Sequence, residues 1–85
     1  MKVLIPSPLH SYTKKNLVEA TGDTLDELLN DLESQFPGIR FRVIDEQENM
    51  RPHMRFFINN EQVFDLHHRL LATDSVALVQ ALSGG

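Results

Sequence analysis

The clearest pattern in the chain is an apolar stripe at helical spacing between Thr24 and Phe36. Apolar residues recur every three or four positions, with polar and acidic residues between them; the stripe consists of Leu25, Leu28, Leu29, Leu32 and Phe36. Thr24-Leu25-Asp26-Glu27 has the form of a capping box, in which a hydroxyl and a carboxylate accept from free N–H groups at a helix start. Pro37-Gly38 ends the pattern. We therefore predict an amphipathic helix over 24–36 with its acidic face in solvent.

Two apolar runs that contain few charges stand near the two ends of the chain. Lys2-Val3-Leu4-Ile5 is closed by Pro6 and predicts a strand buried on both faces. The segment 75–81 has no charged residue and predicts a final strand at the centre of a sheet. If both strands are central they are neighbours, and the helix between them supplies the long connection that parallel pairing needs.

Weaker patterns predict further strands between these runs. The segment 11–20 favours a second strand, antiparallel to the first. A strand within 51–58 would place Met54, Phe56 and Ile58 on one face, with Arg55 and Phe57 on the other. By periodicity alone, the alternation of apolar and basic residues over 39–44 also predicts a strand.

The later connections have turn-forming and irregular sequences. Asn59-Asn60 predicts a tight turn, because asparagine tolerates positive φ, and a short strand over 62–64 would follow. The segment 65–74 is predicted to be irregular, with Leu66, Leu70 and Leu71 directed inward.

These elements together predict an α+β fold. One helix with a single apolar stripe must lie across one face of one sheet. We therefore expect a β-grasp, or ubiquitin-like, roll with a mixed sheet of four to five strands. The predicted domain spans 1–82, and 83–85 form a flexible tail.

The tail Ser83-Gly84-Gly85 is the strongest candidate for chemistry. Two glycines make a thin, extended segment whose terminal carboxylate can enter a narrow channel in another protein. Glycine is about 7% of average composition, so a chain ends in Gly-Gly by chance in about 0.5% of cases. The tail alone therefore suggests a function without establishing one.

Composition narrows the classes of function. The chain has no cysteine, which excludes a disulfide framework, a thiolate metal site and a cysteine nucleophile. Its net charge of −4 argues against binding to nucleic acid through phosphate neutralisation. With no signal-peptide pattern and no membrane-length apolar segment, we expect a soluble, cytoplasmic monomer that binds neither nucleic acid nor membrane.

Four stretches together resemble the ubiquitin-like sulfur carriers, which include the small subunit of molybdopterin synthase, the thiamin sulfur carrier and the mycobacterial-type carrier for cysteine synthesis. They are Gly22-Asp23-Thr24-Leu25, Phe36-Pro37-Gly38-Ile39, Phe56-Phe57-Ile58-Asn59-Asn60-Glu61, and Asp74-Ser75-Val76-Ala77-Leu78 continuing to Gly84-Gly85. The third stretch favours the cysteine-type carriers. The resemblance also implies a helical turn over 39–44, in place of the strand that periodicity predicts.

The resemblance implies a role for the chain as a co-substrate and not as an enzyme. A partner enzyme of the ubiquitin-activating type would adenylate Gly85 with ATP, and a sulfur donor would convert the adenylate to a thiocarboxylate for a sulfur-accepting synthase. Gly84, without a side chain, would let the tail pass through the channel of the partner, and Ser83 would begin the tail. The chain would bind no cofactor itself, since it has no phosphate-binding glycine loop.

The alternation of the strands also predicts a partner-binding surface on the sheet face opposite the helix. Phe57, Ala77 and Val79 would lie on it, with Leu82 beyond them. Isolated apolar side chains are common on any surface, so this assignment stays open. Four arginines are interpreted as a solvated face, with pairing to an acidic rim of the partner as the alternative: Arg40, Arg42, Arg51 and Arg55.

Other functions remain possible from the sequence. A protein modifier would use Gly85 to form an isopeptide bond to lysine, and a non-covalent β-grasp module would not use it at all. A metal site is not expected, because the four histidines lack the spacings of zinc motifs: His10, His53, His67 and His68. The acceptor pathway, of the cysteine or molybdopterin type, is not determined.

Overall fold

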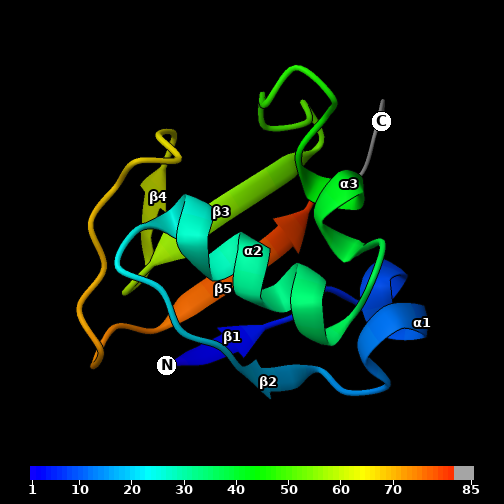
Figure 1. The fold of residues 1–85 in the computed structure, drawn as a ribbon, viewed down its shortest axis with the longest axis horizontal. Helices are drawn as coiled ribbons and strands as arrows, with labels where there is room; N and C mark the ends of the chain where they lie inside the picture. Colours follow the sequence, from blue (N-terminus) through cyan, green and yellow to red (C-terminus); the bar gives the residue numbers. More distant parts are fainter. Residues whose placement is uncertain (82–85) are drawn as a thin grey trace.

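The computed structural model describes residues 1–81 as a five-stranded mixed sheet with one main helix across one face (Figure 1). In chain order the elements are β1 (Lys2–Leu4), η1 (Ser7–Leu9), α1 (His10–Thr13), β2 (Leu17–Glu19), α2 (Leu25–Gln35), α3 (Ile39–Val43), β3 (Met54–Ile58), β4 (Glu61–Val63) and β5 (Val76–Gln80). The strand order is β2-β1-β5-β3-β4, with β1 and β5 parallel and the other neighbours antiparallel. The predicted β-grasp fold is confirmed.

The core lies between α2 and the sheet. All four leucines of the α2 stripe are buried, and they pack in one cluster with side chains of the strands, among them Val3, Phe56 and Leu78. Burial of each such side chain stabilises the fold by roughly 1.5–3 kcal/mol relative to exposure. Because α2 occupies one face only, the other face of the sheet stays open.

The start of α2 is held by its own cap and by the irregular segment after β4. Thr24 Oγ1 accepts from the Glu27 N–H at 3.2 Å. The N–H groups of Leu25 and Asp26 donate to carbonyl oxygens of His68 and Leu66, at 3.1 and 2.8 Å. The segment 65–70 therefore completes the helix cap, which explains how an irregular sequence keeps a defined position.

Three predictions for β1, for the segment 11–20 and for Leu71 need correction. β1 is not buried on both faces, since no helix of residues 1–81 covers the second face and Leu4 is 44% exposed. Only Leu17–Glu19 of the segment 11–20 is a strand, because residues 10–13 form α1, which Lys14 ends with a φ of 62°. Leu71 is not directed inward: it is 68% exposed, in a turn closed by hydrogen bonds from the Leu71 N–H to the Asp74 carboxylate and from the Asp74 N–H to the Leu71 carbonyl oxygen.

The turn after β3 is confirmed, with a small shift in the strand that follows. Asn59 and Asn60 both have positive φ, at 51° and 71°. β4 begins one residue earlier than predicted, and Phe64 lies beyond its end with 77% of its surface exposed.

Ile39–Val43 form the helix α3 and Ile44 is extended, so the strand predicted over 39–44 from periodicity is wrong and the helical turn implied by the resemblance is confirmed. Gly38 adopts a left-handed φ of 98°. The Glu33 carboxylate then accepts from the Gly38 and Arg40 N–H groups at 2.8 and 3.0 Å. Ile39 and Val43 are buried one turn apart. The contacts of Glu33 across the turn therefore decide the conformation.

Candidate partner-binding face and tail exit

An apolar row crosses the open face of the sheet. Leu17 pairs with Leu4, Leu4 with Ala77, and Ala77 with Phe57. Leu17 and Leu4 are 45% and 44% exposed, and Ala77 and Phe57 are half-buried. Adjacent positions in such a row share one face, so four neighbouring strands contribute apolar side chains to one surface.

The predicted partner-binding residues fall into two groups. Phe57, Ala77 and Val79 lie on the face opposite α2, because Phe56, Leu78 and Val76 of the same strands are buried beneath that helix. Val79 is 39% exposed and pairs with Arg55. Leu82 lies outside the described residues, and so does the tail Ser83-Gly84-Gly85.

Leu4 and Leu17 extend this face, although sequence reasoning did not assign them to it. Leu4 was expected to be buried because its run contains only apolar residues between Lys2 and Pro6. The alternation of side chains along a strand could have indicated the exposure of Leu4. Val3 and Ile5 both belong to the core, which requires Leu4 to point to the opposite face.

The exit of the tail is defined by a hydrogen bond just past β5. The N–H of Ala81 donates to the His53 carbonyl oxygen at 2.7 Å. This bond follows the pair Met54 and Gln80 at the end of the β3 and β5 ladder. The chain is therefore held to the sheet until the last described residue.

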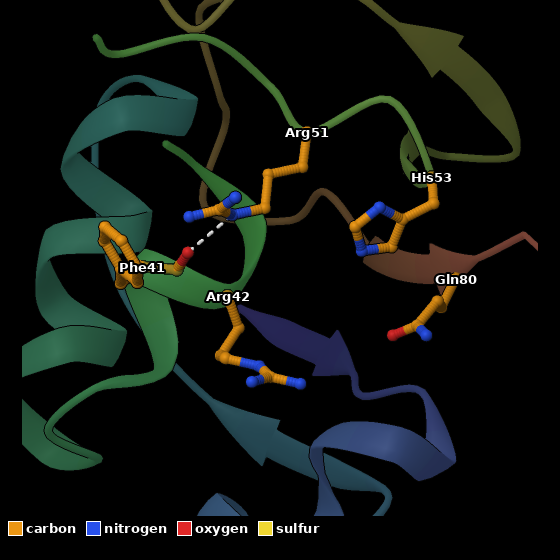
Figure 2. A pocket seen from close by; sticks show the side chains of 5 residues that line it. All are labelled: Phe41, Arg42, Arg51, His53 and Gln80. Atoms are coloured by element: carbon orange, nitrogen blue, oxygen red, sulfur yellow. Dashed lines mark hydrogen bonds between the residues drawn. The ribbon is translucent and has the colours of Figure 1, made fainter. Parts of the chain in front are cut away.

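An open pocket of about 270 Å³ lies beside this exit (Figure 2). It is lined by side chains from three segments, namely α3, the approach to β3, and the end of β5: Phe41, Arg42, Arg51, His53 and Gln80. Arg51 Nε donates to the Phe41 carbonyl oxygen at 2.7 Å, and the guanidinium carbon lies 4.6 Å from the centre of the Phe41 ring. These contacts hold the Arg51 guanidinium at the pocket.

The four arginines considered together in the sequence have different surroundings. Arg40 pairs with Asp26 at 2.6 Å and with Glu48 at 3.0 Å. The hydrogen bonds with Glu48, and then with Asp26, raise the pKa of Arg40 in spite of its partial burial. Arg55 donates to the Pro52 and Met54 carbonyl oxygens. Only Arg42 and Arg51 reach the pocket, so no common surface unites the four.

The described part of the chain has neither a metal-binding cluster nor a membrane-spanning helix. Within residues 1–81, no three His, Cys, Asp or Glu side chains gather in a way that could hold a metal ion. In the same residues no helix combines the length and the apolar character needed to cross a membrane.

Comparison with known proteins gives a family match over nearly the whole chain. The model of the ThiS family matches residues 3–85. The chain belongs to the ThiS family. The match includes the di-glycine end and confirms the resemblance to the ubiquitin-like sulfur carriers. Similarity to a CysO sulfur carrier confirms that the resemblance is to the cysteine-type carriers in particular.

Individual relatives support the family assignment. The sulfur carrier protein CysO of Mycobacterium tuberculosis is 33% identical over 89 residues, covering 98% of this chain and 96% of the relative. A crystal structure of the BexX/CysO complex from Amycolatopsis orientalis matches with a TM-score of 0.91 and 31% identity, covering 99% and 98% of the two chains. SAMP1 from Haloferax volcanii matches with a TM-score of 0.80 and 25% identity, covering 100% and 98%.

Proposed function

We propose that this chain carries sulfur on its C-terminus for a biosynthetic pathway of the cysteine type. A partner enzyme adenylates the Gly85 carboxylate, and a sulfur donor converts it to a thiocarboxylate. The observation that carries this proposal is the family match through Gly84-Gly85, together with a relative named as a sulfur carrier over almost the same length. A second enzyme then accepts the sulfur.

The chemistry suits a terminal glycine. A carboxylate oxygen of Gly85 attacks the α-phosphorus of ATP, and pyrophosphate leaves. Sulfide or a persulfide sulfur then attacks the acyl carbon, and AMP leaves with the electrons of the broken bond; a persulfide adduct needs a thiol to release the thiocarboxylate. A glycine has no side chain to hinder either attack or passage through a channel. ATP and the sulfur donor are bound by partners, while this chain supplies the acyl group.

The open sheet face supports the docking part of the proposal. Phe57, Ala77 and Val79 lie on the face that α2 leaves uncovered, and Leu82 follows the strand that bears two of them. A solved relative is described as a complex of CysO with BexX, so a carrier of this fold does bind a second protein. We propose that the same face of this chain contacts the adenylating enzyme and that the free carrier is a monomer. We propose that the reaction takes place in the cytoplasm, where ATP is available.

Intact mass spectrometry tests the loading reaction. The purified chain is incubated with its adenylating enzyme, ATP and sulfide, and a chain ending at Ser83 serves as the matched control. The full chain should gain the mass difference between sulfur and oxygen, and the control should not. An unchanged mass, with an enzyme that shows ATP-pyrophosphate exchange on another carrier, would refute the proposal.

A protein modifier is the second candidate. SAMP1, which matches at 25% identity, is named as a small archaeal modifier protein. In that role the Gly85 acyl group would pass to a lysine amine and form an isopeptide bond. Tryptic peptides that carry a C-terminal remnant of this chain on lysine, recovered from cells, would favour this function over sulfur transfer.

A further inference from the structure

The pocket beside the tail exit concentrates positive charge on an acidic protein. The chain as a whole has a net charge of −4. The pocket nevertheless contains two guanidinium groups and an imidazole, from Arg42, Arg51 and His53, with the Gln80 amide as a further polar group (Figure 2). Of the described residues, none that lines it is acidic.

The two arginines of the pocket keep their charge available. Among residues 1–81, the ion pairs that involve arginine use Arg40 alone, and Arg55 donates to backbone carbonyl oxygens. Within the described part of the chain, Arg51 donates a hydrogen bond through Nε alone, to the Phe41 carbonyl oxygen. Its two terminal nitrogens therefore remain for a ligand, and stacking on the Phe41 ring limits the entropy lost when one binds.

The pocket and the apolar face lie on opposite sides of the strand that leads to the tail. Gln80 shares the parity of Val76 and Leu78, which face α2, whereas Val79 faces the open side. The Ala81 to His53 hydrogen bond joins the strand end to the pocket wall. A protein that takes up the tail must therefore come close to both surfaces.

We propose that Arg42 and Arg51, assisted by His53 and Gln80, bind carboxylate side chains of an acidic segment at the rim of the enzyme channel that receives the tail. This inference rests on the proposed function, because the tail must enter a partner. A guanidinium pairs with a carboxylate through two parallel hydrogen bonds, which adds orientation to attraction. The contact would direct Gly85 into the channel while the apolar face supplies contact area.

Direct binding is tested by NMR on the full chain, with the acetylated tetrapeptide of four glutamates as the probe. The amide shifts of Phe41, Arg42, Arg51, His53 and Gln80 should change and saturate at millimolar peptide. A tetraglutamine peptide should produce no such changes. The proposal would be overturned if the glutamate peptide produced none of these shifts. It would also be overturned if inorganic phosphate produced them and the glutamate peptide did not.

Kinetics test the same site in the enzyme complex. Arg42→Glu with Arg51→Glu should raise the carrier KM in ATP-pyrophosphate exchange by about tenfold or more, with kcat nearly unchanged. Lys14→Glu with Arg69→Glu makes the same change in net charge and should leave KM within about twofold. Arg42→Glu alone keeps the Arg51 and Phe41 contact and should still raise KM.

The outcomes of the two experiments separate this inference from the proposed function. An equal rise in KM for the pocket pair and the control pair would show a general charge effect and overturn the assignment. If the wild-type chain supports no exchange at all, the proposed function fails, while the NMR titration still decides whether the pocket binds carboxylates.

Discussion

The backbone N–H of Ala81 donates to the carbonyl oxygen of His53, with 2.7 Å between nitrogen and oxygen. The bond extends the antiparallel contact between β3 and β5 past the pair of Met54 with Gln80. It keeps the end of β5 close to the approach to β3, where Arg51 and His53 line the basic pocket. The tail therefore starts from a fixed corner, between that pocket and the apolar face.

Charge on the open sheet face should weaken binding to the adenylating enzyme. Phe57→Asp combined with Val79→Asp would place two carboxylates in a surface that must lose water on docking, and we expect affinity to fall by about tenfold or more. The free energy of unfolding should change by no more than about 1 kcal/mol, since neither residue is in the core. Calorimetric titration and urea unfolding measure the two effects.

Phe64→Asp is the control for this experiment, because Phe64 is 77% exposed but follows β4 at the sheet edge. It should leave affinity unchanged. If the variant with both Phe57 and Val79 replaced were already unfolded in buffer without urea, these two residues would belong to the core instead.

A side chain at position 22 should destabilise the fold. A Cβ on Gly22 would lie 2.4 Å from the Leu28 backbone nitrogen and 2.9 Å from the Glu27 carbonyl carbon. Both are backbone atoms of α2, so the helix or the loop has to move. Gly22→Ala should cost about 2 kcal/mol or more in urea unfolding.

Gly38→Ala offers a comparison with a different cause. A Cβ there would come 3.1 Å from a Tyr12 ring atom, and the main cost would be the left-handed backbone at a φ of 98°. We expect Gly38→Ala to lower the free energy of unfolding by about 1–2 kcal/mol.

Equal free energies of unfolding for the wild type and Gly22→Ala would contradict the prediction for Gly22, because they would show that the loop before α2 can move without cost.

Removal of Arg40 should destabilise the packing of α3 against α2. Its guanidinium joins Asp26 on α2 to Glu48 in the turn after α3, and its side chain is only 17% exposed. Arg40→Met should cost about 1–3 kcal/mol, since Asp26 loses its charged partner while partly buried.

Glu48→Gln should cost less than Arg40→Met, because Glu48 is 62% exposed. High salt should weaken the contribution of Glu48 more than that of Asp26, which is 31% exposed. Urea unfolding at low and high ionic strength checks both statements. A larger loss for Glu48→Gln would contradict them.

Acid should weaken the contact that holds α3. The N–H groups of Gly38 and then Arg40 lower the pKa of Glu33. The folded protein therefore binds a proton at Glu33 less readily than the unfolded chain does. The stability from Glu33 is fully present above the ordinary glutamate pKa of about 4.3 and is lost as pH falls through the lowered pKa.

Glu33→Gln should make stability less dependent on pH below this value, because the neutral amide cannot titrate. Thermal unfolding of both proteins at pH 7 and at several acidic pH values provides the measurement. Asp74 is the internal control, since the Leu71 N–H and then the Asn59 amide lower its pKa in both proteins. The same pH dependence in both proteins would show that Glu33 does not contribute.

The sequence predicted the main helix, the parallel pairing of the end strands as a possibility, and the buried face of β3. The helix and the buried face of β3 follow from local periodicity, because burial on one side of a helix or strand repeats at 3.6 or 2 residues. The parallel pairing follows from two apolar runs with few charges, joined by a connection long enough for parallel strands. The strand predicted over 39–44 was wrong because periodicity describes only the segment itself. Apolar and basic residues alternate there, but Glu33 caps the turn from an earlier helix, and periodicity within the segment carries no information about that contact.

The candidate site also has features that the sequence predicts and features that only the tertiary structure decides. Gly84-Gly85 and the apolar residues of β3 and β5 were evident from the sequence, as was the likeness to the sulfur carriers. The sequence could not separate Arg42 and Arg51 from Arg40 and Arg55, because their partners lie in other segments. Tertiary structure decided which arginines are paired within the chain, which reach the tail exit, and that Leu4 and Leu17 join the open face. Each depends on strand register and helix placement, which bring together residues that are distant along the chain.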